Sequence, residues 1–250
     1  PLGMHDSTFG FTTQQGDHAD PRLALGHFED GATQAAVPTY LRPAGQFTTT
    51  ATDMGRLARF LMGDGRIDGK TFIDAALLQA MGQPAGTEAA GTGLRVGYGL
   101  GLATRDRHGA VGKCHGGSTI GYRAMLCLFP HHRRAFFVAI NADIERADYG
   151  RFDRLLIQAL QVEAPAPQSP KAASADTNAW DGYYVPAPNR FAGFAWLDTT
   201  LNFVRVRSSG DGLQFKPFQS PEVSLAASGG SLFRASDRAM YASKQAKQPD

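Results

Sequence analysis

The stretch "KCHGGSTIGYRAMLCLF", residues 113–129, decides how the rest of the chain is interpreted. Its apolar residues lie in two short runs of the length and alternation that are typical of strands. We therefore predict strands over 110–118 and 122–129, joined as an antiparallel hairpin by a turn within 118–123. In this hairpin His115 lies beside a backbone that carries no side chains at the next two positions.

Further strands are predicted on both sides of this hairpin. "VGYGLGLAT" (96–104) indicates a glycine-rich strand, "RDRHG" (105–109) a turn, and "AFFVAINAD" (135–143) a fourth strand. Because the links are short, the four strands should form an antiparallel meander. A helix is expected over 149–161, packed on one face of the sheet through a single apolar stripe. The stripe consists of Phe152, Leu155, Leu156, Ala159 and Leu160.

The part that precedes the sheet is predicted to be loop over 1–40, followed by two helices. Thr50 and Asp53 fit a capping box, in which a hydroxyl and a carboxylate accept hydrogen bonds at a helix start. Apolar residues follow at helical spacing, and "GDGR" ends this first helix. A second amphipathic helix is expected over 72–81.

Downstream of the sheet, the composition changes twice. Residues 163–178 are rich in Pro, Ala and Ser and are predicted to be an interdomain linker. Residues 179–238 contain short β-type runs and many aromatic residues, which predict a small all-β, barrel-like domain whose core those rings fill. The tail, 239–250, is predicted to be disordered.

Composition and charge exclude several classes of function. The 250 residues carry 25 basic and 23 acidic side chains, a balance unlike a nucleic-acid-binding surface. No apolar run approaches the ~20 residues that a membrane span needs. The two cysteines, Cys114 and Cys127, give no metal signature, and we predict no metal and no other cofactor. They would be cross-strand neighbours, and we expect two buried thiols in preference to a disulfide.

Five segments, in this order, resemble the C-terminal half of the serine β-lactamase and penicillin-binding-protein-like family. They are "PLGMHDSTF" (1–9), "PAGQFTTTATDMGRLARFL" (43–61), "GYGLGL" (97–102), "HGGSTIGYRAMLCLFP" (115–130) and "FFVAINAD" (136–143). The most similar members are class C-like esterases, D-aminopeptidases and D,D-peptidases. The resemblance covers roughly residues 1–162 and implies an α+β, β-lactamase/transpeptidase-like fold that is present only in part. The aromatic C-terminal part resembles the small β-barrel-like domain often appended to such enzymes.

The resemblance implies a function in acyl transfer to and from a serine. His115-Gly116-Gly117 matches the family's HxG motif, on the strand that flanks the cleft. Gly116 and Gly117 would bind substrate along the bare strand edge, and the backbone N–H of Ser118 would be one of two oxyanion-hole donors. His115 would tune the electrostatics of the cleft and bind a substrate carbonyl or carboxylate. The substrate would be a small molecule or a peptide.

The family's SxxK and YxN motifs are absent from the 250 residues, and in the family both precede the "PLGM" segment. The sequence therefore predicts a chain that is inactive alone and needs the N-terminal half of the same protein as partner. Its sheet should keep an unpaired edge, through which it could self-associate, and an apolar face that no helix covers. A non-enzymatic binding module or pseudoenzyme half is the alternative. The family also implies a periplasmic or other extracytoplasmic location.

Overall fold

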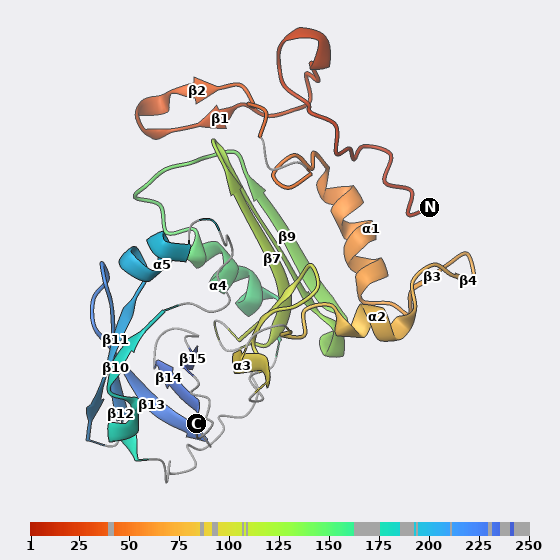
Figure 1. The fold of residues 1–250 in the computed structure, drawn as a ribbon. Coiled ribbons are helices and arrows are strands. Elements are labelled where there is room, and N and C mark those ends of the chain that lie inside the picture. The colour runs from red at the N-terminus through yellow and green to blue at the C-terminus, as the bar shows by residue number, and fades with distance from the viewer. Residues whose placement is uncertain are drawn as a thin grey trace.

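The structure is a computed structural model that describes residues 1–39, 43–85, 88–91, 95–106, 108, 110–162, 176–185, 193, 195–210, 212–229, 232–235 and 241–242. Its helices are α1 (Ala51–Leu61), α2 (Ala75–Ala80), α3 (Glu88–Gly91), α4 (Gly150–Ala159) and α5 (Ala195–Leu201). Two larger antiparallel sheets organise the described residues, one before and one after residue 163. Figure 1 shows α1 and α4 on opposite sides of the first sheet.

The first sheet is a five-stranded meander, and the predicted hairpin lies at its centre. Its strands, in spatial as well as chain order, are β5 (Gly97–Tyr98), β6 (Ala103–Arg105), β7 (Gly112–Thr119), β8 (Tyr122–Phe129) and β9 (Arg134–Ile140). The prediction of an antiparallel meander is confirmed, and β7 and β8 match the predicted strands closely. Short links force each strand to pair with its predecessor, which is why chain order and spatial order agree.

The prediction of a single strand over 96–104 is wrong, because this segment folds into the β5–β6 hairpin. Gly97 pairs with Thr104 and Tyr98 with Ala103. Between these strands the N–H of Gly99 donates to the carbonyl of Leu102 at 2.9 Å. A Cβ at position 99 would overlap the backbone of Gln83, so this position requires glycine, and Gly101 adopts a positive φ of 69° in the turn.

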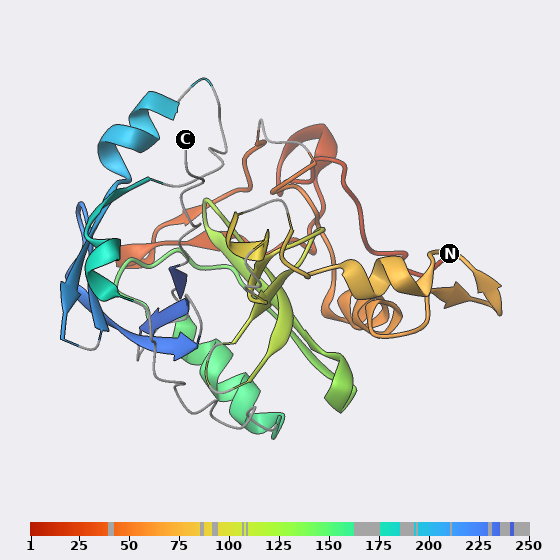
Figure 2. The same ribbon diagram turned by 60° about the horizontal axis from the view of Figure 1, so that its bottom comes forward.

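Both faces of the five-stranded sheet carry a helix, which corrects the expectation of a face that no helix covers. On one face, Met54 and Ala58 of α1 form a buried cluster with Leu126 and Leu128 of β8. On the other face, Ile157 of α4 joins a cluster whose further buried members are Ala110, Cys114, Cys127, Phe129 and Phe136. Each face therefore has its own core, and Figure 2 shows α1 and α4 well apart.

Helix α4 packs on the sheet as predicted, but through a different stripe. Ile157 is buried and Leu156 and Leu160 are partly buried against the sheet, whereas Phe152 and Leu155 are 48% and 51% exposed. Ala159 is exposed as well. The apolar spacing predicts a helix, but it allows either of two adjacent helix faces to be buried. The face that is buried is the one whose Ile157 packs in a cluster with Cys127 and Phe136.

The first helix begins as predicted. The hydroxyl of Thr50 accepts a hydrogen bond from the N–H of Asp53, which is one half of a capping box. The second predicted helix is shorter than 72–81, because the Asp74 carboxylate caps α2 at the N–H of Ala76. Two strand pairs flank these elements: β1 (Gly26–His27) with β2 (Thr33–Gln34), and β3 (Arg66–Ile67) with β4 (Lys70–Thr71).

The second sheet has six antiparallel strands, again in chain order. They are β10 (Gly182–Tyr184), β11 (Val204–Ser209), β12 (Gly212–Pro217), β13 (Val223–Gly229), β14 (Leu232–Ala235) and β15 (Tyr241–Ala242). Its buried core consists of Trp180, Val206, Leu213, Leu225 and Phe233. The rings of Trp180 and Phe233 pack edge to face, with centroids 5.1 Å apart.

The purely β character predicted for 179–238 is wrong in one place, because 195–201 form α5. The hydroxyls of Thr199 and Thr200 bond to the carbonyls four residues back, an arrangement that competes with strand pairing. Residues 177–180 form a 3-10 turn, so the end of the predicted linker is structured. Residues 163–175, like most of the predicted disordered tail 239–250, lie outside the described residues; Tyr241–Ala242, within that tail, pair with β14. The domain division stays a prediction.

Candidate functional site: an open strand edge

Strand β7 has two strand neighbours along its first part and one along its second. Strand β6 pairs with β7 only at Gly112, Lys113 and Cys114. Strand β8 pairs with β7 from Lys113 to Thr119. Among the described residues, therefore, the segment 115–119 has β8 on one side and no strand on the other.

The register determines which backbone groups of this segment point to the open side. Thr119 and Tyr122 close a two-residue turn, and Cys114 and Cys127 face each other with their Cα atoms only 4.1 Å apart. So short a separation marks a pair without mutual hydrogen bonds. Because the pattern alternates, the N–H groups of Gly116 and Ser118 point away from β8, and no backbone partner outside the strands accepts from them among the described residues.

Side chains of the segment alternate between the two faces of the sheet. His115 pairs with Leu126, which lies in the cluster under α1, so His115 and Gly117 share that face. His115 is exposed. Ser118 pairs with Arg123 on the opposite face. Ser118 can therefore offer its N–H at the edge, while its hydroxyl lies on the face away from His115.

The two glycines are bare for different reasons. A Cβ at Gly116 would lie 2.8 Å from the terminal methyl of Met125, so the flexible end of that side chain would have to move aside. A Cβ at Gly117 would meet nothing within 4 Å. Gly117 thus leaves open space next to His115, on the same face, where an extended ligand could approach the backbone.

Cys114 and Cys127 form a disulfide in the structure, so the expectation of two free thiols is wrong. Both residues are 4% exposed and belong to the cluster under α4. A pair without mutual hydrogen bonds brings facing side chains closest together in an antiparallel sheet, and this position allows the sulfurs to meet. The bond lies on the face opposite His115.

The turn end of the β7–β8 hairpin is held by the N-terminal loop. Gly121 adopts a positive φ of 79°, and a Cβ there would lie 2.9 Å from the Cα of Gly26 in β1. The hydroxyl of Tyr122 donates to the carbonyl of Ala24 at 2.7 Å and accepts from the amide of Gln14 at 3.0 Å. Tyr122 is therefore bound within the protein and supports the turn.

Arg123 has a structural role of the same kind. Its guanidinium pairs with Asp143 and lies over the ring of Tyr149, 4.5 Å from the centroid. The hydrogen bond to Asp143 raises the pKa of Arg123 above its usual value, against the effect of burial. On the His115 face, Lys113 donates to the carbonyl of Gln79 at 2.7 Å, and burial lowers the pKa of this lysine. Lys113 thereby ties β7 to α2.

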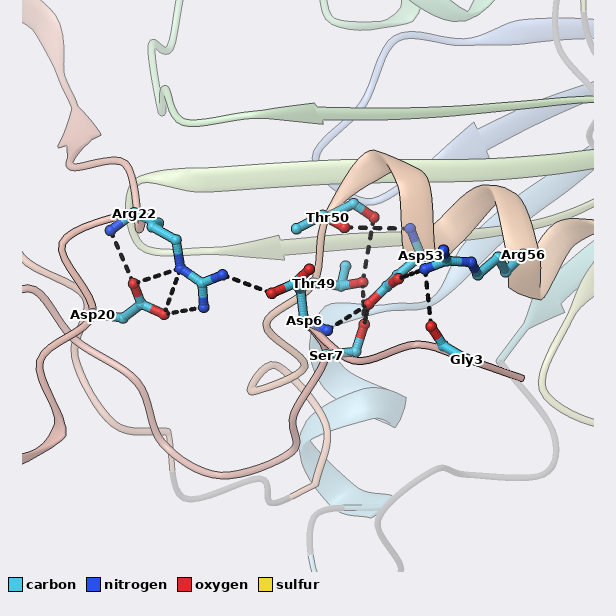
Figure 3. A network of polar contacts seen from close by, with 9 residues as sticks. All are labelled: Gly3, Asp6, Ser7, Asp20, Arg22, Thr49, Thr50, Asp53 and Arg56. Atoms are coloured by element: carbon cyan, nitrogen blue, oxygen red, sulfur yellow. Dashed lines mark hydrogen bonds and ion pairs between the residues drawn. The ribbon is translucent and has the colours of Figure 1, made fainter. Parts of the chain in front are cut away.

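A buried carboxylate anchors the N-terminal segment to α1, a contact that the sequence pattern did not reveal. Asp53 is fully buried and accepts hydrogen bonds from the N–H of Asp6, the hydroxyl of Ser7 and the guanidinium of Arg56 (Figure 3). Burial alone would raise the pKa of Asp53, but these hydrogen bonds together lower it below its usual value. The carboxylate that was expected to complete a capping box therefore binds residues 46 and 47 positions away in sequence.

Among the described residues, no group of three or more His, Cys, Asp or Glu side chains could hold a metal ion. Within the same residues, no helix has the length and apolar character needed to cross a membrane. The sheet edge at 115–119 remains as the place where the predicted site residues His115, Gly116, Gly117 and Ser118 come together.

Comparison with known proteins agrees with this architecture. The beta-lactamase family model matches residues 1–161. The chain belongs to the serine beta-lactamase and penicillin-binding-protein-like family. A search of curated proteins found no match.

The solved structures that are similar to the chain include two of SurE. A crystal structure of SurE is 20% identical, with a TM-score of 0.50 over 90% of this chain and 50% of SurE. A crystal structure of SurE with D-Leu is 19% identical, with a TM-score of 0.46 over 95% of this chain and 52% of that one. The first shows a shared fold only. The chain spans about half the length of these proteins.

Proposed function

We propose that the chain supplies the substrate-binding strand of a serine hydrolase that transfers an acyl group from an amide, ester or β-lactam. The observation that carries the proposal is the open edge of β7, where the N–H groups of Gly116 and Ser118 point away from β8. An extended substrate would pair with this edge as an added strand. The missing side chains at 116 and 117 would let it approach the backbone.

In this proposal the edge of β7 stabilises the negative charge that develops on the substrate, and a nucleophile elsewhere forms the covalent bond. As a nucleophile attacks the carbonyl, negative charge develops on the carbonyl oxygen, and the N–H of Ser118 would donate to it. His115, exposed on the face that it shares with Gly117, would bind a polar group of the substrate. The SxxK serine and lysine and the YxN tyrosine of the family are not in these 250 residues, so they would have to come from outside this sequence.

An extracytoplasmic location is part of the proposal. Disulfides persist mainly in oxidising compartments, and the bond between Cys114 and Cys127 supports such a location. The same open edge could also pair with a second copy of the chain, which would compete with substrate.

Backbone N–H resonances of the 250-residue chain provide the test. The probe is N-acetyl-L-Lys-D-Ala-D-Ala, added while ¹H–¹⁵N correlation spectra are recorded. We expect the peaks of Gly116 and Ser118 to shift together. Ser118→Pro removes the N–H and should abolish the shift of Gly116, whereas the matched variant Ser118→Ala keeps the N–H and should preserve it.

Other results would contradict the proposal. If the shifted peaks lie outside 115–119, the chain is a binding module of another kind. If the chain alone hydrolyses nitrocefin well above buffer and Ser118→Ala stops the reaction, the Ser118 hydroxyl is the nucleophile and the assigned role of its N–H is wrong.

A further inference from the structure

The disulfide lies at the boundary between the doubly paired and the singly paired part of β7. The pair of Ala103 with Cys114 is the last one between β6 and β7. The next residue, His115, is the first with an open side. The covalent bond therefore joins β7 to β8 at the point where β7 loses its other neighbour.

Between the disulfide and the turn, the open segment has few contacts of its own that hold its register. It has one neighbouring strand, and it contains Gly116 and Gly117, which contribute no cross-strand side-chain contact. A shift of one residue would turn the N–H groups of Gly116 and Ser118 toward β8 and move His115 to the opposite face. Such a shift is incompatible with a bond between Cys114 and Cys127, because these residues would no longer face each other.

We propose that the Cys114–Cys127 disulfide is a positioning device that fixes the register of β7 on β8 and so keeps the N–H groups of Gly116 and Ser118 at the open edge. The far end of the segment is fixed separately, by the packing of Gly121 on Gly26 and by the hydrogen bonds of Tyr122. The functional meaning of this positioning rests on the proposed function. The positioning itself is a property of the free chain and can be measured without ligand.

The test is amide hydrogen exchange of the full 250-residue chain with both cysteines replaced. Two variants are used: Cys114→Ala with Cys127→Ala, and Cys114→Val with Cys127→Val, which keeps apolar volume between the strands. The matched control is Ile157→Ala, which opens a cavity in the same buried cluster but leaves the disulfide intact. The probes are the N–H groups of His115, Gly117 and Thr119, which face β8.

Removal of the bond should release the open segment more than the rest of the sheet. Exchange at His115, Gly117 and Thr119 should rise on the order of 100-fold in the cysteine variants, given a bond that closes a short loop. Exchange at β8–β9 pairs should rise much less. The Gly116 and Ser118 peaks should broaden or move, and Ile157→Ala should leave them in place.

Two outcomes would overturn the inference. One is a uniform rise of exchange across β7, β8 and β9 that matches the Ile157→Ala control, which would make the bond a general core contact. The other is failure of both cysteine variants to fold, since the bond would then serve the whole sheet and not this segment. Neither outcome depends on whether N-acetyl-L-Lys-D-Ala-D-Ala binds, so failure of this inference and failure of the proposed function are distinguishable.

Discussion

The two sheets of the protein bury their apolar side chains in different ways. The five-stranded sheet is covered on both faces, by α1 over Leu126 and Leu128 and by α4 over the disulfide. The six-stranded sheet builds its core on one face, around Trp180 and Phe233. Its other face carries polar side chains such as Arg207, which is exposed.

The difference shows where each sheet can meet a ligand. Where helices cover both faces of a sheet, a ligand can reach it only at the ends and edges, and in this protein 115–119 of β7 is an edge segment whose His115 and Gly117 are exposed. Coverage on both sides also holds the strands firmly, which an edge of positioned N–H groups requires. The six-stranded sheet is covered on its core face by the 3-10 turn Thr177–Trp180, whose Trp180 ring packs against Phe233.

The comparison predicts that the two sheets lose stability separately. Phe233 is fully buried, and Phe233→Ala should destabilise the six-stranded sheet by about 3–5 kcal/mol. Both tryptophans, Trp180 and Trp196, belong to this part of the chain, so tryptophan fluorescence reports its unfolding. The midpoint of urea unfolding followed by fluorescence should fall sharply.

Leu128→Ala is the matched control in the five-stranded sheet. Leu128 is 1% exposed, and its truncation should cost about 2–5 kcal/mol in that sheet. The fluorescence midpoint should stay in place while the unfolding followed by circular dichroism shifts. A common shift of both signals in both variants would show that the sheets unfold as one unit.

Proline substitutions should separate the two sides of β7. The N–H of Gly117 faces Ala124 of β8, and Gly117→Pro should cost about 1–3 kcal/mol by leaving that carbonyl unpaired. The N–H of Ser118 faces the open edge, and Ser118→Pro should change stability by only about 0.5 kcal/mol. Thermal unfolding of the two variants measures the difference. Equal losses would contradict the alternation on which the candidate site depends.

A buried glutamine gives a smaller effect of opposite sign. Gln46 is 7% exposed, and its side-chain nitrogen and oxygen have no hydrogen-bond partner among the described residues. Gln46→Leu should therefore stabilise the protein by about 1–2 kcal/mol. Gln14, whose side chain bonds to Ala36, Ala24 and Tyr122, is the control, and Gln14→Leu should destabilise. A loss of stability in both variants would mean that Gln46 makes contacts beyond apolar packing.

The smallest expected effect is acid sensitivity from Asp53. Its pKa is lower in the folded protein than its ordinary value of 3.8, so its contribution to stability is complete above that pH and is lost as pH falls further. Denaturant midpoints measured from about pH 5 to about pH 2 should fall less steeply in Asp53→Asn than in the parent. An unchanged slope in the variant would assign the acid sensitivity to other carboxylates.

Local patterns in the sequence predicted much of the five-stranded sheet. The hairpin around 118–123, the helix after Thr50 and the helix on the sheet face all follow from periodicity and turn chemistry, and the structure confirms them. The same patterns gave the wrong secondary structure where a segment could form either a strand or another element. "VGYGLGLAT" has the composition of a strand, but it folds back on itself as a hairpin whose Gly99 lies against Gln83. In α5, local hydroxyl bonds prevail over aromatic strand propensity.

For the candidate site, the sequence by itself determined the chemistry: a titratable ring at His115, bare backbone at Gly116 and Gly117, and a hairpin that pairs 110–118 with 122–129. These depend on residue identity and on neighbours close in the chain. Only the tertiary structure decided that the β6–β7 pairing ends at Cys114, that Cys114 and Cys127 are bonded, and that Asp53 binds the N-terminal segment. The reason is physical. A backbone N–H can bind a ligand only if no other segment of the chain accepts its hydrogen bond. Which distant segments pair is decided by packing, and a local sequence pattern does not predict it.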